Sequence, residues 1–172
     1  EQLEGLKTLA SLPDAGLSPA AKLNKEVVAY ALQLGLDAKP FTYGENTWSS
    51  AMAEASTPYA VSQQSGTYSG AAEFLDSQHT IETKADCDAF LARMRQVATQ
   101  LDQETERVKR DAGQGVIAPD FILSNTLGQL QGMLAVPAAQ ARFVASLADR
   151  AKAKGIAGDW AAQATKIVEA EI

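Results

Sequence analysis

The sequence has few of the residues that form disulfides or bind zinc: its 172 residues include one cysteine, Cys87, and one histidine, His79. One cysteine cannot form a disulfide within the chain. A structural zinc site takes four ligands, mostly cysteine and histidine, so these two residues cannot build one. The length is that of one domain with a core of its own, roughly 100–200 residues. We therefore expect a chain that folds without disulfides and holds no cofactor itself.

The sequence also lacks an excess of positive charge and a long apolar run. Its 15 Lys and Arg stand against 21 Asp and Glu, giving a net charge of −6 and a pI near 4.8. An acidic chain is poorly suited to phosphate backbones, which argues against nucleic acid as a partner. No apolar stretch approaches the roughly 20 residues that cross a bilayer. We expect no nucleic acid partner and no transmembrane segment.

Helical periodicity, punctuated by Gly and Pro, is what the sequence does contain. Ser18 before Pro19 is typical of a helix start, and Gly35 is suited to follow the end of that helix. Thr83 followed by Asp86 resembles a capping box that opens a long helix. The sequence predicts an all-α fold, a single irregular bundle without internal repeats. Its roughly five helices are expected at 19–34, 83–111, 119–137, 138–154 and from 159 onward.

The apolar stripes of these helices predict the core, with the long helix packed along the two helices that follow it. The other face of the long helix carries Arg93, Arg95, Glu106 and Arg110, and we interpret this charged stripe as a solvated surface. The expected core residues are Leu23, Val27, Leu34, Phe90, Met94, Val97, Leu101, Leu123, Leu127, Leu130, Phe143, Leu147, Trp160 and Ile167.

A stretch at about 36–70 is the one part without a regular pattern, and only Trp48 to Ala55 within it could form a short helix. Loops beyond roughly 12–15 residues are uncommon unless functional or disordered, and disordered segments are poor in aromatics. This stretch holds Phe41, Tyr43, Tyr59 and Tyr68 besides Trp48, so we expect an ordered loop. Its aromatics either attach it to the helices or line part of a ligand cleft, and both interpretations stay open.

The familiar catalytic motifs are missing: the chain has no His-Glu-x-x-His, no Gly-x-Gly-x-x-Gly, no P-loop and no Gly-x-Ser-x-Gly. Cys87 lies on an apolar stripe, which favours a buried small side chain over a reactive thiol. His79 precedes the long helix, where a turn or capping role is the more common one. We assign no catalytic residue and no metal ligand to this chain.

The last helix stops without Gly, Asn or a basic final turn, and its glutamates oppose the helix dipole. The first residue is Glu1 instead of an initiator methionine. We therefore expect the chain to be a piece of a longer protein. The length of the encoding reading frame is the observation that would test this expectation most cheaply.

A series of short motifs follows in a recognisable order. They are PYAVSQQSG at 58–66, HTIET at 79–83, Asp86 with FLAR at 90–93, LDQ at 101–103 and GVIAP at 115–119. In this order and spacing, over about residues 17–172, the chain resembles the N-terminal part of family 885 of the domains of unknown function. Members of that family are longer bacterial proteins, mostly helical, whose downstream half carries a zinc motif similar to that of gluzincin-type metallopeptidases. Many are exported.

The resemblance implies that this chain is the non-catalytic N-terminal portion of an exported, zinc-dependent, peptidase-like protein of the periplasm or cell envelope. The zinc would lie in the downstream half, so no catalytic residue carries over. The partners would be the rest of the polypeptide and a peptide substrate, with this portion as a wall or lid of the cleft. The residues expected to face that cleft are Gln63, Gln64, Ser65, Gly66 and Tyr68.

Two other functions remain open at this stage. The chain could be a self-contained helical protein-interaction module that binds a partner helix or itself. A less favoured alternative is an independent small hydrolase built from His79 and a loop serine.

Overall fold

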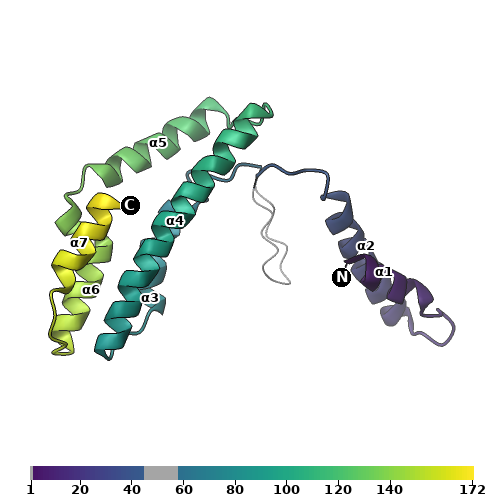
Figure 1. Ribbon diagram of the computed structural model, residues 1–172. Coiled ribbons are helices and arrows are strands. Elements are labelled where there is room, and N and C mark those ends of the chain that lie inside the picture. The colour runs from purple at the N-terminus through teal and green to yellow at the C-terminus, as the bar shows by residue number, and fades with distance from the viewer. Residues whose placement is uncertain (1, 45–57) are drawn as a thin grey trace. The chain divides into compact units, whose positions relative to one another are not determined.

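The computed structural model describes residues 2–44 and 58–172, and the regular structure of this part of the chain is helical (Figure 1). The predicted all-α class is confirmed. The described residues form seven α-helices and one short 3₁₀ helix, where about five helices were predicted. Contacts divide the chain into two compact units, Glu1–Thr42 and Tyr43–Ile172.

The first unit is a hairpin of α1 (Gln2–Ser11) and α2 (Pro19–Asp37). Ser18 caps α2 as predicted, because its Oγ accepts a hydrogen bond of 3.2 Å from the Ala21 amide. The prediction that Gly35 follows the end of the helix is wrong, since α2 continues to Asp37. The helix α1 was not predicted at all.

The core residues predicted for this unit are exposed. Leu23, Val27 and Leu34 are 59, 57 and 50 % exposed, and neither helix contains a buried residue. The prediction is wrong because periodicity marks an apolar stripe without showing how much partner surface covers it. Within their unit the two helices have only each other as partners.

The second unit is built around α4 (Lys84–Gly113), which contacts α3 (Thr67–Gln78), α6 (Arg142–Ala153) and α7 (Trp160–Ala170) (Figure 1). The predicted capping box opens α4. Thr83 Oγ1 accepts from the Asp86 amide at 3.3 Å, and the Asp86 carboxylate accepts from the Thr83 amide at 2.8 Å. With 30 residues, α4 is about 45 Å long.

The core of this unit lies where these four helices meet. Leu75 of α3 and Ile81, which follows it, are 2 and 3 % exposed, and neither was predicted to be buried. The predicted core residues that are buried here are Phe90, Met94, Val97, Phe143, Leu147, Trp160 and Ile167, while Leu101 packs against them partly exposed.

The helix α5 (Asp120–Leu134) departs from the prediction. Leu123 and Leu127 are 40 and 55 % exposed, and Leu130 is partly exposed. The helix diverges from α4 instead of packing along it (Figure 1). The helices that pack against α4 are α6, α7 and α3, the last of which was not predicted from the sequence.

The remaining boundaries differ in smaller ways. The helix predicted at 138–154 is divided into a 3₁₀ helix (Ala138–Gln140) and α6. Asp159 precedes α7 as predicted, but its side chain makes no capping hydrogen bond. The loop expected at about 36–70 is shortened at both ends, by α2 and by α3. Trp48 and the short helix predicted there lie outside the described residues.

Candidate functional site

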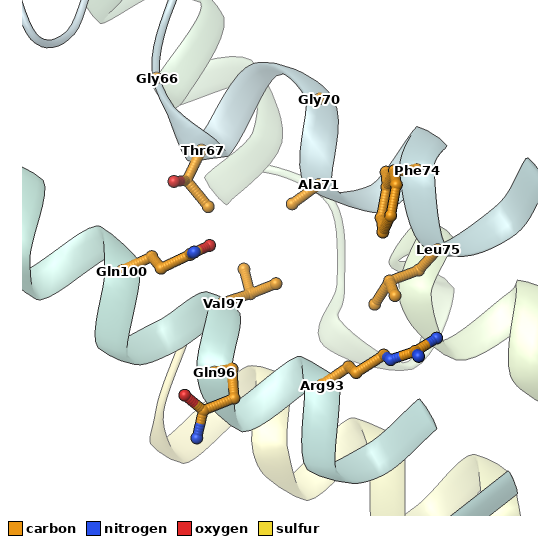
Figure 2. Close-up of a pocket in the computed structure, with 10 residues that line it drawn as sticks. All are labelled: Gly66, Thr67, Gly70, Ala71, Phe74, Leu75, Arg93, Gln96, Val97 and Gln100. Carbon is orange, nitrogen blue, oxygen red and sulfur yellow. The ribbon is translucent and has the colours of Figure 1, made fainter. Parts of the chain in front are cut away.

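A groove of about 530 Å³ runs between α3 and α4 (Figure 2). Its surface is mostly apolar, with Leu75 and Val97 at the floor and Phe74 at one edge. From α4, Gln100 points toward α3, whereas Gln96 lies at the outer edge and points away from it (Figure 2). The residues that line it are Gly66, Thr67, Gly70, Ala71, Phe74, Leu75, Arg93, Gln96, Val97 and Gln100. Volumes of this order are typical of small-ligand clefts.

The position of α3 in this groove is set at its N-terminus by α4. Gly66 precedes α3 with φ of +107°, a conformation that a side chain would strain, and offers no capping side chain. The Glu104 carboxylate supplies the cap instead. It accepts from the Thr67 amide at 2.9 Å and from the Thr67 hydroxyl at 2.7 Å. The unpaired amide at the start of α3 is thereby satisfied.

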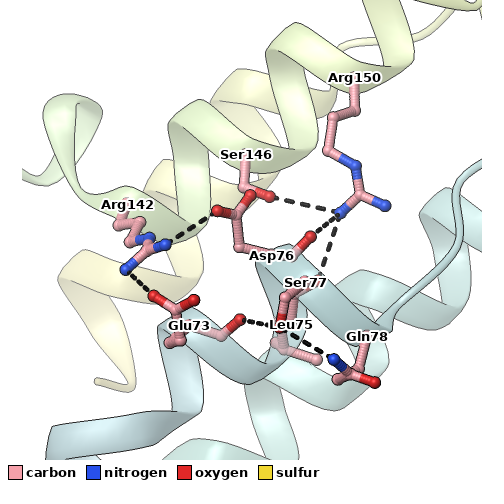
Figure 3. Close-up of polar contacts among 8 residues, drawn as sticks. All are labelled: Glu73, Leu75, Asp76, Ser77, Gln78, Arg142, Ser146 and Arg150. Carbon is pink, nitrogen blue, oxygen red and sulfur yellow. Dashed lines mark hydrogen bonds and ion pairs between the residues drawn. The ribbon is translucent and has the colours of Figure 1, made fainter.

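The C-terminus of α3 is held by α6 (Figure 3). The Arg150 guanidinium donates to the carbonyl oxygens of Leu75 at 3.3 Å and Asp76 at 3.0 Å, and also to that of His79. These are the last carbonyls of a helix, which have no partner inside it. Arg142, on the same side of α6, pairs with the carboxylates of Glu73 and Asp76 at an exposed site.

His79 has a structural place beside the groove. Its ring is 4 % exposed and meets Phe90 edge-on, with centroids 5.1 Å apart. Nε2 donates to the Asp86 carbonyl oxygen at 2.9 Å, and Nδ1 accepts from Arg93 Nη1. Burial lowers the pKa of His79, and the neighbouring Arg93 and Arg150 lower it further, so the ring is neutral. With both nitrogens engaged, His79 offers no support for a hydrolase built on it.

The residues predicted to face a cleft lie close together, in a turn and the first turn of α3. Ser62 and Ser65 close the turn through backbone hydrogen bonds of 3.1 and 3.3 Å and a contact of 2.8 Å between their hydroxyls. Of the predicted five, Gly66 lines the groove. Gln64 is exposed, and the buried Oε1 of Gln63 has no hydrogen-bond partner among the described residues.

Tyr68 is buried, is not among the residues that line the groove, and has its hydroxyl engaged in hydrogen bonds. The hydroxyl lies 2.6 Å from the Ser62 carbonyl oxygen and 2.6 Å from Gln129 Oε1 of α5. Burial raises the pKa of Tyr68, so the phenol keeps its proton at neutral pH and donates it within this cluster. The contact joins α3 to α5 across the turn.

Most of the residues that line the groove were not predicted from the sequence. Arg93 was placed on the solvated stripe of α4, and Gln96 and Gln100 were not singled out. No local pattern identifies them, because the groove exists only once α3 lies beside α4. The short motif at 90–93, which ends in Arg93, was the one available signal, and it was used only for the resemblance.

Metal ligands are scarce in the described part of the chain. Within residues 2–44 and 58–172, no three His, Cys, Asp or Glu side chains are grouped so that they could hold a metal ion. Cys87 is fully buried, and burial raises the pKa of its thiol. Among the described helices, none is long and apolar enough to cross a membrane.

The fold and the groove define an all-α protein with an open, largely apolar groove on its second unit. The chain belongs to the family described as bacterial proteins of unknown function (DUF885), whose model matches residues 2–172. The resemblance inferred from the motif series is thus confirmed, and it extends further toward the N-terminus than expected. No curated protein and no solved structure matches the chain.

Proposed function

We propose that this chain forms a wall of the substrate cleft in an exported, zinc-dependent, peptidase-like protein, and that the α3–α4 groove binds the peptide. The observation that carries the proposal is the groove itself, which has an apolar floor beside the amide side chain of Gln100. An extended peptide needs both, since its side chains seek apolar surface while its backbone seeks hydrogen-bond partners. Gln100, which points into the groove, can donate to and accept from a peptide backbone.

The zinc does not fit the described residues of this chain, because His79 and Cys87 are both buried and engaged in packing or hydrogen bonds. In the proposed protein the metal would be held by residues outside this chain, where it would activate water for attack on a peptide carbonyl. The role proposed for the present residues is to bind and orient the peptide. This part of the proposal, like export to the periplasm or cell envelope, rests on the family resemblance.

The test uses the product of the complete encoding reading frame. Gln100→Ala removes a groove amide, and we expect KM for peptide hydrolysis to rise about two- to tenfold, the worth of one hydrogen bond. Gln103→Ala, an exposed residue of the same helix outside the groove, is the matched control and should leave KM unchanged. Gln64→Ala and Tyr68→Ala test the residues predicted from sequence. An unchanged KM in Gln100→Ala, with an unchanged fold, would refute peptide binding by the groove.

Export has its own experiment. Fractionation of the producing bacterium should place the protein in the periplasm or envelope fraction. Recovery in the cytosolic fraction alone would remove that part of the proposal and leave the groove untouched.

A protein-interaction module is the second candidate function, and the exposed apolar surface of α5 favours it. Leu123, Leu127 and Leu134, which share one face of the helix by their spacing, are 40, 55 and 83 % exposed. Exposed apolar patches of this kind mark contact surfaces. Light scattering of the chain tests the self-associating form of this function, which predicts a dimer that Leu134→Ser weakens. A monomer that binds no apolar dye would count against the interaction module.

A further inference from the structure

We propose that the α3–α4 groove recognises the free C-terminal carboxylate of a peptide, and that Arg93 is the residue that binds it. The inference rests on the proposed function, since it names the part of the peptide that the same groove selects. It adds that the peptide bound in the α3–α4 groove carries a negative charge, although the groove lining is otherwise uncharged.

The first observation is the charge distribution in the groove. Among the ten described residues that line it, Arg93 alone is charged. Two other arginines of the second unit pair with carboxylates, Arg95 with Glu171 and Arg142 with Glu73, and Arg150 donates to backbone carbonyls. Within residues 2–44 and 58–172, no carboxylate lies in ion-pair distance of Arg93. The lining thus carries one cation and no anion, since the Glu104 carboxylate at the Thr67 end is used in capping α3, and such a lining is complementary to an occupant with one negative charge.

The second observation is that Arg93 is held in place. Its Nη1 donates to His79 Nδ1, and the other ring nitrogen of His79 is fixed by the Asp86 carbonyl oxygen. His79 is a neutral acceptor, so it orients the guanidinium without neutralising it. Arginine has five N–H donors, and four of them are not used by His79. A guanidinium with a preset direction loses less side-chain entropy when it binds a carboxylate.

The third observation is the end of the groove at which Arg93 lies. Thr67 meets Glu104 at one end, and His79 meets Arg93 at the other, so α3 and α4 run in opposite directions along it. Figure 2 shows Arg93 reaching toward Leu75, away from Thr67 and Gln100. Residues 79–83 join the two helices at the Arg93 end. A peptide lying in the groove meets that connection, which favours the end of a chain over an acidic side chain in its middle.

The experiment compares three peptides on the 172-residue chain by NMR titration. They are N-acetyl-Ala-Leu-Ala-Leu with a free carboxylate, the same peptide as the C-terminal amide, and N-acetyl-Ala-Glu-Ala-Leu amide. We expect the free acid to bind about tenfold more tightly than its amide, as for a hydrogen bond to a charged group. The difference should shrink at high salt. The internal glutamate should not restore it.

Variants assign the effect to one residue. Arg93→Gln should abolish the difference between acid and amide, while Arg93→Lys should keep part of it, because lysine keeps the charge and loses the planar fork. Arg95→Gln is the matched control, an exposed arginine of the same helix outside the groove, and should keep the full difference. Circular dichroism checks the fold of each variant. If Arg93→Gln fails to fold, the role of Arg93 is decided by two other measurements. These are the difference in affinity between acid and amide in the natural sequence and the reduced difference in Arg93→Lys.

The outcomes separate the two proposals. If neither the acid nor the amide binds, the groove does not bind peptides and the proposed function fails, taking this inference with it. If both bind equally, the groove binds peptides but does not select the carboxylate, and only this inference is overturned. It is equally overturned if the glutamate peptide matches the free acid, or if Arg93→Gln keeps the tenfold difference.

Discussion

Two arginines of α6 reach α3, and the structure predicts very different energies for them (Figure 3). Arg150 is half-buried and donates to three backbone carbonyls, whereas Arg142 is 51 % exposed and pairs with two carboxylates. The carbonyls lose their partner when Arg150 is removed, at a site that is partly buried. The carboxylates that Arg142 leaves behind are solvated at once. Substitution by methionine keeps the apolar stem of either arginine and removes its donors.

We expect Arg150→Met to lower the free energy of unfolding by about 2–3 kcal/mol, at roughly 1 kcal/mol for each of the part-buried hydrogen bonds that it removes. Arg142→Met should lower it by less than about 1 kcal/mol, the usual worth of an exposed ion pair. The dependence of these two losses on salt concentration distinguishes the variants further. In about 0.5 M NaCl the loss in Arg142→Met should nearly vanish because exposed charges are screened, while the loss in Arg150→Met should persist.

Urea unfolding followed by tryptophan fluorescence measures both values. A Trp48→Phe background leaves Trp160 as the single reporter, and Trp160 lies in the core of the second unit at 4 % exposure. Amide hydrogen exchange in the last turn of α3 gives an independent, local measurement. Equal losses in the two variants, or a loss in Arg150→Met that salt removes, would show that the carbonyl contacts do not hold α3.

Three further predictions concern the same unit. Glu104→Gln should lower the free energy of unfolding by about 1–2 kcal/mol because it weakens the cap of α3. The control Glu106→Gln, at an exposed ion pair, should change it by no more than about 0.5 kcal/mol. Equal urea midpoints for the two variants would contradict the capping role. Because burial lowers the pKa of His79 in the folded chain, the unfolded chain protonates this ring at a higher pH than the folded chain does. The free energy of unfolding should therefore fall as the pH drops below about 6.5 toward the folded pKa. His79→Gln should remove this contribution to the pH dependence. Leu147→Ala should lower the free energy of unfolding by about 2–5 kcal/mol because Leu147 is 0 % exposed. Leu134→Ala should change it by no more than about 0.5 kcal/mol because Leu134 is 83 % exposed. Similar changes in melting temperature for the two variants would contradict this difference in burial.

The parts of the fold that were predicted correctly depend on residues close together in sequence. Ser18 caps the helix that begins at the next residue, and Thr83 forms its capping box with Asp86. The heptad-like spacing of Phe90, Met94 and Val97 identified the buried face of α4. Each of these signals acts within one or two helical turns, which is the range that a single sequence reveals.

The parts that were missed depend on distant residues. The helix α3 begins at Gly66 without a local capping side chain, and its cap is Glu104, 37 residues after Thr67. Its other end is held by Arg150, 71 residues after His79. Leu123 and Leu127 form a good apolar stripe, but their burial depends on which helix packs beside α4. The groove and Arg93 share this dependence, since one wall of the groove is the missed helix.

The attachment of α3 at both ends has a consequence for how the groove comes to exist. Neither end of α3 is closed by its own residues, so the helix has little reason to form before α4 and α6 are in place. The amide hydrogens of α3 should therefore exchange when α3 separates from α4 and α6, and not by fraying of the helix ends alone. On this reasoning α3 is the last wall of the groove to form, and a chain that has not finished folding has no α3–α4 groove.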